Sequence, residues 1–281
     1  MSLFASVFPG YIKALLLAAV VFIPFERLAG AQPAQRILRR GSATDVLTGF
    51  MNALLLYGVL LAAITGLDGL AAINAPHLRI WVATRPFWAQ AVLAIAVGDL
   101  GIYAIHRLVH TVPWLWRFHA IHHSAEEMDW LVAARNHPVD LLLFRVASLG
   151  PLAMLHVTPA AFGAFVLVFG WQAWLAHANV RLQYGPLRHV LVSPDFHHWH
   201  HSAEREARNK NYAGLLACWD VLFGTIYLPR GGRPFHFGVD ERIPAGYANQ
   251  LFHPFRRNPR LRVPLEARTA RRTSCGTSAA T

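Results

Sequence analysis

The stretch 106–123 reads H-R-L-V-H-T-V-P-W-L-W-R-F-H-A-I-H-H. Its five histidines are His106, His110, His119, His122 and His123. A second stretch at 197–201, H-H-W-H-H, repeats the H-x-x-H-H spacing with His197, His200 and His201. Residues three and four positions apart share one face of a helix. Each stretch can therefore direct two or three imidazoles at one point.

Neutral imidazoles bind zinc, iron, copper and nickel, while the second ring nitrogen is held by a neighbouring acceptor. One zinc ion takes about four ligands, of which a catalytic site supplies about three from the protein. The eight histidines named above therefore predict two metal ions that share the nitrogen donors. A lone histidine would more simply be a core or surface residue, but clusters with a repeated helical spacing argue against that interpretation.

The composition indicates a membrane protein. Apolar residues make up 54% of the 281 residues and charged residues 15%, whereas a soluble domain carries about a quarter charged residues. The formal charge of +11 would suit nucleic acid, but 15 of the 26 Lys and Arg residues follow His177. A basic segment beside apolar ones favours anionic lipid headgroups over nucleic acid. The two cysteines, Cys218 and Cys275, imply neither a disulfide framework nor a Cys-based metal site.

Apolar segments of membrane-spanning length precede the first histidine stretch. Residues 47–67 hold no charge and 86–105 hold only Asp99, and each can cross roughly 30 Å of hydrocarbon. The segment 3–25 is apolar apart from Lys13 but is interrupted by prolines. It is predicted to be a retained first span or an interfacial segment.

A further apolar segment, 141–176, contains only Arg145 and His156 as ionisable residues. Pro151 and the H-V-T-P turn at 156–159 divide it, so we predict a helical hairpin. The chain as a whole is predicted to be an all-α integral membrane protein with four to five transmembrane helices.

Arginines in the short loops predict the orientation, because cytoplasmic loops carry the excess of positive charge. Four arginines lie between residues 27 and 40, and only two lie in the loop 68–85. Counting spans from the cytoplasmic four-arginine loop puts every histidine cluster and the C-terminus on the cytoplasmic side, in a helical cap. In a bacterium this would be the inner membrane.

Three regions follow from these segments. Residues 1–105 form the first transmembrane helices with the Arg-rich loop, 106–228 form the histidine-rich region with its membrane hairpin, and 229–281 form a basic cytoplasmic tail.

Five motifs resemble the fatty acid hydroxylase and sterol desaturase superfamily. They are H-R-L-V-H, W-R-F-H-A-I-H-H-S, R-N-H-P-V-D, S-P-D-F-H-H-W-H-H-S and W-D-V-L-F-G-T. The resemblance covers about 99–227 and is specific, because the histidine clusters occur in order with the family's spacing.

The resemblance implies an integral-membrane enzyme that uses O2 and two non-haem iron ions to hydroxylate a C–H bond of a lipid. The implied ligands are His106, His110, His119, His122, His123, His177, His197, His200 and His201, with His137 as a weaker candidate. Asp99 and Asp220 are the carboxylates expected to orient imidazoles. Two departures affect the ligand count: Arg181 stands where some members have a further histidine, and His198 is expected to face away from its neighbours.

Electrons must come from elsewhere, because the chain has no Gly-rich dinucleotide fingerprint and no haem-binding segment. A ferredoxin- or cytochrome-type donor with its reductase is therefore implied.

Three alternatives stay open. Lipid or sterol desaturation would use the same residues. A membrane zinc hydrolase would need a glutamate general base, as in H-E-x-x-H, and neither stretch contains one. A metal transporter would place its ligands within the spans, whereas these lie at one end.

Overall fold

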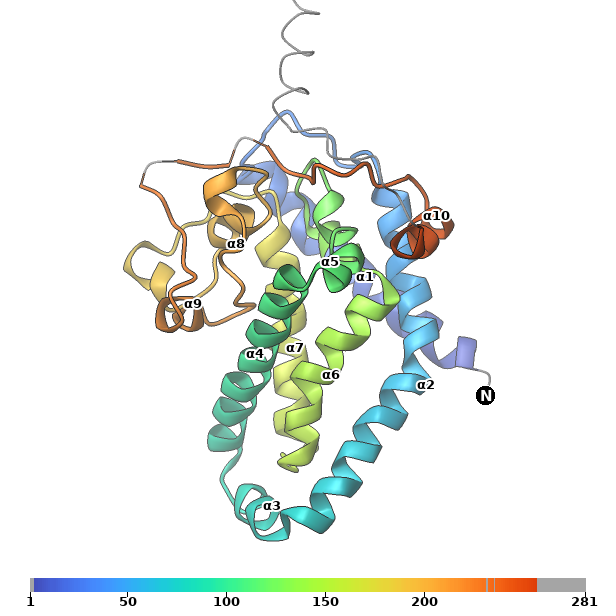
Figure 1. Ribbon diagram of the computed structural model, residues 1–281, viewed down its shortest axis with the longest axis vertical. Coiled ribbons are helices and arrows are strands. Elements are labelled where there is room, and N and C mark those ends of the chain that lie inside the picture. Colours follow the sequence, from blue (N-terminus) through green and yellow to red (C-terminus); the bar gives the residue numbers. More distant parts are fainter. Residues whose placement is uncertain (1–2, 231, 235, 257–281) are drawn as a thin grey trace, which may run out of the picture.

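The computed structural model describes residues 3–230, 232–234 and 236–256. Within these residues the ordered elements are helices, and the only bridges of the β type are two isolated residue pairs. The predicted all-α class is therefore confirmed. Figure 1 shows a tapering set of long helices, the stem, below a broader cap of short helices and loops. We call α2, α3, α4, α6 and α7 the stem and the rest of the described chain, apart from α1, the cap.

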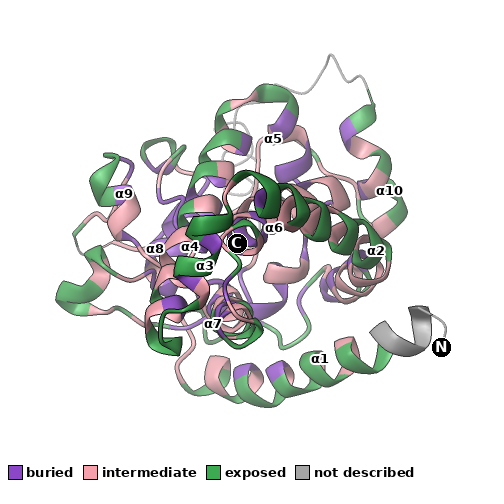
Figure 2. Cartoon of the chain, turned by 90° about the horizontal axis from the view of Figure 1, so that it is seen from below, coloured by how far each residue is buried: buried purple, intermediate pink, exposed green. Residues whose placement is uncertain are grey.

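Four helices are long and apolar enough to cross a membrane, which agrees with the prediction of four to five. They are α1 (Leu3–Leu28), α2 (Ser42–Asn74), α4 (Phe87–Thr111) and α7 (Pro159–His177). Large apolar side chains such as Leu61 and Leu167 are exposed on their surfaces. Figure 2 shows exposed residues on the outward faces and buried residues gathered in the middle. Such a surface suits lipid rather than water, so the chain is a membrane protein.

The predicted hairpin consists of α6 (Pro138–Met154) and α7, with the break at 155–158 alone. Pro151 lies inside α6 instead of ending it, so that part of the prediction is wrong. A proline leaves the carbonyl four residues earlier without its helical partner, here that of Ala147. A Cβ at Gly101 of α4 would lie 2.1 Å from this oxygen. The absence of a side chain at Gly101 thus lets α4 and α6 approach closely.

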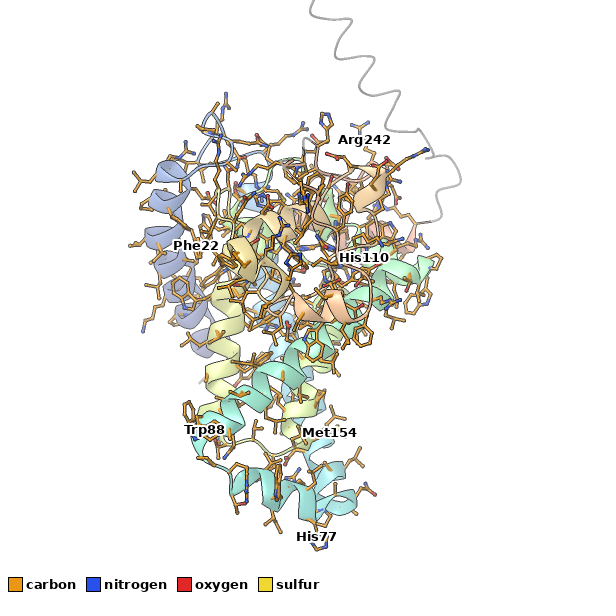
Figure 3. All side chains as sticks on the ribbon, turned by 90° about the vertical axis from the view of Figure 1, so that its left-hand side faces the viewer. Phe22, His77, Trp88, His110, Met154 and Arg242 are labelled. Atoms are coloured by element: carbon orange, nitrogen blue, oxygen red, sulfur yellow. The ribbon has the colours of Figure 1, made fainter. Side chains whose placement is uncertain are left out.

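Helix α1 lies beside the cap end of the molecule, inclined to the stem helices (Figures 1 and 3). Phe22 anchors it, buried at 3% exposure against Trp130 and the α7 residues Trp171 and Trp174. The carboxylate of Glu26 accepts hydrogen bonds from the backbone N–H groups of Trp130 and Asn179, both at 2.9 Å. Helix α1 therefore braces two segments that follow predicted metal ligands.

The two ends of the stem differ. At the narrow end, α3 (Pro76–Ala83) joins α2 to α4. At the other end are α5 (Pro113–His119), α8 (Pro194–His200), α9 (Cys218–Leu222) and α10 (Tyr247–Phe252). Figure 3 shows His110 at the cap end and His77 at the narrow end. The predicted basic tail, 229–281, is described only in part, and its segment 257–281 lies outside the described residues.

Candidate metal centre

The first histidine stretch forms the end of one helix and the whole of the next. His106 and His110 lie on the last two turns of α4. Pro113 then begins α5, where its fixed φ suits the first turn and its missing N–H costs nothing. Helix α5 ends at His119, and His122 and His123 follow in a short 3₁₀ turn, His122–Ser124. The reversal brings the ring of His119 to 5.0 Å from that of His106, and the ring of His123 to 4.8 Å from that of His110.

The second stretch lies on α8, which Ser193 caps: its hydroxyl accepts the backbone N–H of Phe196 at 3.2 Å. Asp195 lies in the first turn of the helix. His177, at the end of α7, completes the arrangement.

Nine histidines gather in two groups that could each hold a metal ion, with the candidate ligand atoms of each group within 4.8 Å of one another. The five-histidine group is His106, His110, His119, His123 and His200. The four-histidine group is His122, His177, His197 and His201. Each H-x-x-H-H motif is divided between the groups, because its first and last histidines enter one group and its middle histidine the other. The groups adjoin where the rings of His123 and His201 stack, 4.2 Å apart.

The ring nitrogens are spaced as metal ligands would be. In the four-histidine group, Nε2 of His177 lies 3.1 Å from that of His122 and 2.9 Å from that of His197. In the other group, Nε2 of His119 and His123 are 3.2 Å apart. Two nitrogens each about 2.1 Å from one ion, at a right angle, lie about 3.0 Å apart. The donor set therefore fits a metal ion in each group.

Buried nitrogens without partners support the same interpretation. Nε2 of His106, His110 and His200 is buried and has no hydrogen-bond partner within the described structure. An orphaned buried polar atom is costly, and a metal ion would satisfy all three at once.

The opposite nitrogens fix the rings. Nδ1 of His106 donates to the Tyr212 carbonyl at 2.7 Å, and Nδ1 of His200 to the Lys210 carbonyl at 2.8 Å. In the other group, Nδ1 of His177 donates to the Ala173 carbonyl at 2.7 Å. A proton on Nδ1 leaves the Nε2 lone pair free for a metal.

Two further rings have partners close in sequence. Nδ1 of His122 donates to the Arg135 carbonyl at 3.1 Å, and Nδ1 of His119 donates to the Asp140 carboxylate at 3.0 Å. Asp140 lies in the first turn of α6 and is fully buried. Sequence reasoning missed it, although it ends the quoted motif R-N-H-P-V-D.

The loop 209–216 supplies the carbonyls that hold His106 and His200. Asn209 and Asn211 adopt left-handed backbone, with φ of 57° and 60°, a conformation that asparagine tolerates better than most residues. The Asn211 side chain donates to the carbonyls of Phe196 and Tyr227 and accepts the Tyr227 N–H at 2.7 Å. This loop is therefore fixed on both sides.

Asp99 and Asp220, predicted to orient imidazoles, bind the backbone of the loop 209–216 and not the rings themselves. Asp99 accepts the backbone N–H groups of Leu215 and Leu216, both at 2.8 Å. Asp220 accepts those of Tyr212 and Ala213 and the hydroxyl of Thr225. In the described structure neither carboxylate is hydrogen-bonded to a histidine. Both hold the loop, and the loop's carbonyls hold the rings.

His137 lies outside both groups, so its prediction as a further ligand does not match the structure. Its Nδ1 accepts the N–H of Val139 at the start of α6, and its Nε2 donates to the Leu251 carbonyl at 3.0 Å. Both nitrogens are used in joining α6 to α10. His198 also stays outside the groups, as expected.

A buried ionic network fastens the four-histidine group to the start of α2. Arg135, whose carbonyl holds His122, pairs through Nε with Asp45 at 2.9 Å. Arg39 pairs with Asp45 and with Asp129, the latter at 2.9 Å. Two positive and two negative side chains balance, which a buried network requires.

Burial keeps these imidazoles neutral. Desolvation lowers the pKa of His122 to about 3 and that of His200 to about 4, against an ordinary value of 6.5. At neutral pH both rings therefore offer a lone pair rather than a proton.

Comparison with known proteins points to one family. Residues 91–225 match the family model for fatty acid hydroxylases. An ornithine lipid hydroxylase of Rhizobium tropici is 34% identical over 189 residues, which cover 66% of this chain and 56% of the relative. The human alkylglycerol monooxygenase is 36% identical over 161 residues, which cover 53% of this chain and 35% of the relative. The chain thus spans about half or less of these relatives. No solved structure matches it.

Both histidine groups fall within the matched region, and the hydroxylase and monooxygenase relatives align across more than half of this chain. The region 91–225 of this chain belongs to the fatty acid hydroxylase superfamily.

Proposed function

We propose that this protein is an O2-dependent lipid hydroxylase with two iron ions, one in each histidine group. The observation that carries the proposal is the pair of adjoining all-histidine groups where the stem meets the cap. Neutral ligands leave the metals more positively charged than a carboxylate-rich site would. Bound iron would supply the two oxidation states needed to reduce O2 and oxidise a C–H bond.

The protein's own part in the reaction is to hold the ligands and exclude water. The carbonyls of Tyr212, Lys210 and Arg135 fix the rings of His106, His200 and His122. Phe144 of α6 lies against the site, its ring stacked on His119 at 5.5 Å and edge-on to His106 at 5.3 Å. The Phe144 ring thus provides apolar surface where a lipid would enter from the stem.

The substrate class follows from the location and from the relatives. One relative is named an ornithine lipid hydroxylase and another an alkylglycerol monooxygenase, both lipid names. A lipid in the bilayer can reach a site at the end of the stem without leaving the membrane. Desaturation of a lipid or sterol by the same metal centre is the alternative. The position of the substrate's carbon chain at the centre decides between hydroxylation and desaturation.

The orientation and the electron donor belong to the same proposal. The arginines between 27 and 40 support a cytoplasmic cap. A ferredoxin- or cytochrome-type donor with its reductase would then bring electrons to the cap. The two groups contain only histidines among the described residues, which argues against a zinc hydrolase that needs a carboxylate base.

Elemental analysis tests the proposal. We expect about two irons per chain in protein purified in detergent, as two nitrogen-rich groups require. His122→Ala and His200→Ala remove one ligand from each group and should each lower the iron content. His137→Ala, outside both groups, is the matched control and should leave it unchanged. One zinc per chain, with no iron after anaerobic reconstitution, would contradict the proposal.

Lipid profiling of cells with and without the protein then distinguishes the outcomes. Hydroxylation adds one oxygen to a lipid, whereas desaturation removes two hydrogens. His122→Ala should abolish either product.

A further inference from the structure

Arg145 lies in the middle of α6, where no described acidic residue pairs with it. Its neighbours in sequence, L-L-L-F on one side and V-A on the other, are apolar. Its backbone carbonyl accepts the Ser148 hydroxyl. In the described structure, however, its guanidinium has no hydrogen-bond or ion-pair partner, and no charged group acts on it.

The helical phase directs Arg145 into the bundle. Leu149 and Leu152 follow it by four and seven positions and so lie on the same face of α6. Both pack in the apolar cluster that contains Ala94 of α4 and Phe165 of α7. Arg145 therefore faces the space between α4, α6 and α7, inside the molecule, and not the surrounding lipid.

Packing around α6 loosens just where Arg145 lies. Ser148, Leu149 and Gly150 are buried, whereas every residue from 141 to 147 is only half-buried. No guanidinium nitrogen of Arg145 is among the described atoms that are sealed from solvent without a partner. The Arg145 guanidinium thus keeps part of its surface accessible, although the residue lies inside the bundle. The preceding residue, Phe144, touches the rings of His119 and His106, so Arg145 lies one residue along α6 from a contact with the candidate metal centre.

An unpaired guanidinium inside a membrane protein is costly, and such residues pair or mark a ligand pathway. A planar guanidinium binds carboxylate or phosphate through two parallel hydrogen bonds. We propose that Arg145 binds the anionic group, a carboxylate or a phosphate, of the lipid that enters this site. That the lipid is the substrate rests on the proposed function.

The placement has a consequence for the reaction. With its anionic group on α6 beside Phe144, the lipid would present to the histidine groups a carbon close to that anionic group. Oxidation should then fall near the polar end of the lipid and not at the far end of its chain.

Binding to the metal-free full chain in a non-ionic detergent tests the proposal without turnover. The probes are palmitate, hexadecyl phosphate and hexadecanol, which share one chain and differ in the head. We expect at least one of the two anions to bind about tenfold tighter than hexadecanol, the scale of a charge-assisted hydrogen bond. Which anion is preferred distinguishes a carboxylate from a phosphate source.

Arg145→Met keeps an unbranched side chain of similar stem and removes the guanidinium with its charge. It should erase the preference for the anion and leave hexadecanol binding unchanged, while Arg145→Lys should keep part of the preference. Arg85→Met is the matched control, because Arg85 is exposed and, among the described residues, its guanidinium contacts Trp81 and Thr84 near the narrow end of the stem. It should bind all three probes as the parent does.

Equal binding of the three probes by the parent protein would overturn the proposal, and this outcome depends on no variant. Retention of the preference in Arg145→Met would overturn it as well. Because the assay involves neither iron nor O2, anion binding can be found even if hydroxylation is not. Conversely, hydroxylation without a preference for the anions would contradict the proposed role of Arg145 and leave the proposed hydroxylase function intact.

Discussion

At the scale of single residues, the group that accepts the Nδ1 proton of each imidazole affects how strongly that imidazole binds a metal. Within the two histidine groups, four of the five Nδ1 partners described above are backbone carbonyls, and His119 alone of these five donates to a side chain, Asp140. A carboxylate acceptor makes the imidazole a stronger donor to a metal than a carbonyl does. His119 is therefore the ligand most sensitive to substitution of its partner.

Asp140→Asn tests this point. The amide keeps the size of the side chain but loses the charge, so we expect iron affinity to fall about 10–100-fold. Competition with a chelator measures the change. Asp240→Asn, which removes an exposed ion pair with Arg208, should have no effect. Unchanged affinity in Asp140→Asn would mean that the carboxylate does not tune the site.

At the scale of elements, the loop 209–216 joins Asp99 in the middle of α4 to the five-histidine group. Its carbonyls hold His106 and His200, both in that group, whereas the four-histidine group depends on α7, α8 and Arg135. Disturbing the loop should therefore affect one group and spare the other.

Asn211→Ala removes three side-chain hydrogen bonds that fix this loop. We expect the free energy of unfolding to fall by about 1–3 kcal/mol for each buried group left without a partner. We also expect the iron content to fall from about two per chain to about one. Asn211→Gly tolerates the left-handed backbone and separates loss of those bonds from backbone strain. Equal loss from both groups, seen by elemental analysis and Mössbauer spectroscopy, would contradict the assignment.

At the scale of the whole molecule, the buried histidines link stability to pH. Burial lowers the pKa of His122 to about 3 and that of His198 and His200 to about 4. These histidines bind protons below about pH 6.5 in the unfolded chain. In the folded protein they bind protons only at the lower pH set by their lowered pKa values. Stability is therefore present at neutral pH and is lost as the pH falls.

We expect the midpoint of thermal unfolding of the metal-free protein in detergent to fall steadily from about pH 7 to about pH 5. Each such histidine contributes about 1 kcal/mol per pH unit. Burial raises the pKa of Asp220, which offsets part of this loss. His198→Gln removes one buried histidine outside both groups and should flatten the slope. A midpoint independent of pH over this range would contradict the linkage.

The sequence alone determined the helical class, the apolar segments and the nine histidines that the structure brings together. Helical periodicity and membrane-length apolar runs are local properties, and the repeated H-x-x-H-H spacing is readable without a fold. The tertiary structure decided how those histidines divide, why His137 stands apart, and that Asp140, not Asp99 or Asp220, contacts a ring. Those outcomes depend on which backbone carbonyls and carboxylates meet each imidazole after distant segments pack. Spacing along one helix cannot show that, because a ring's second nitrogen is satisfied by whatever lies opposite it in space.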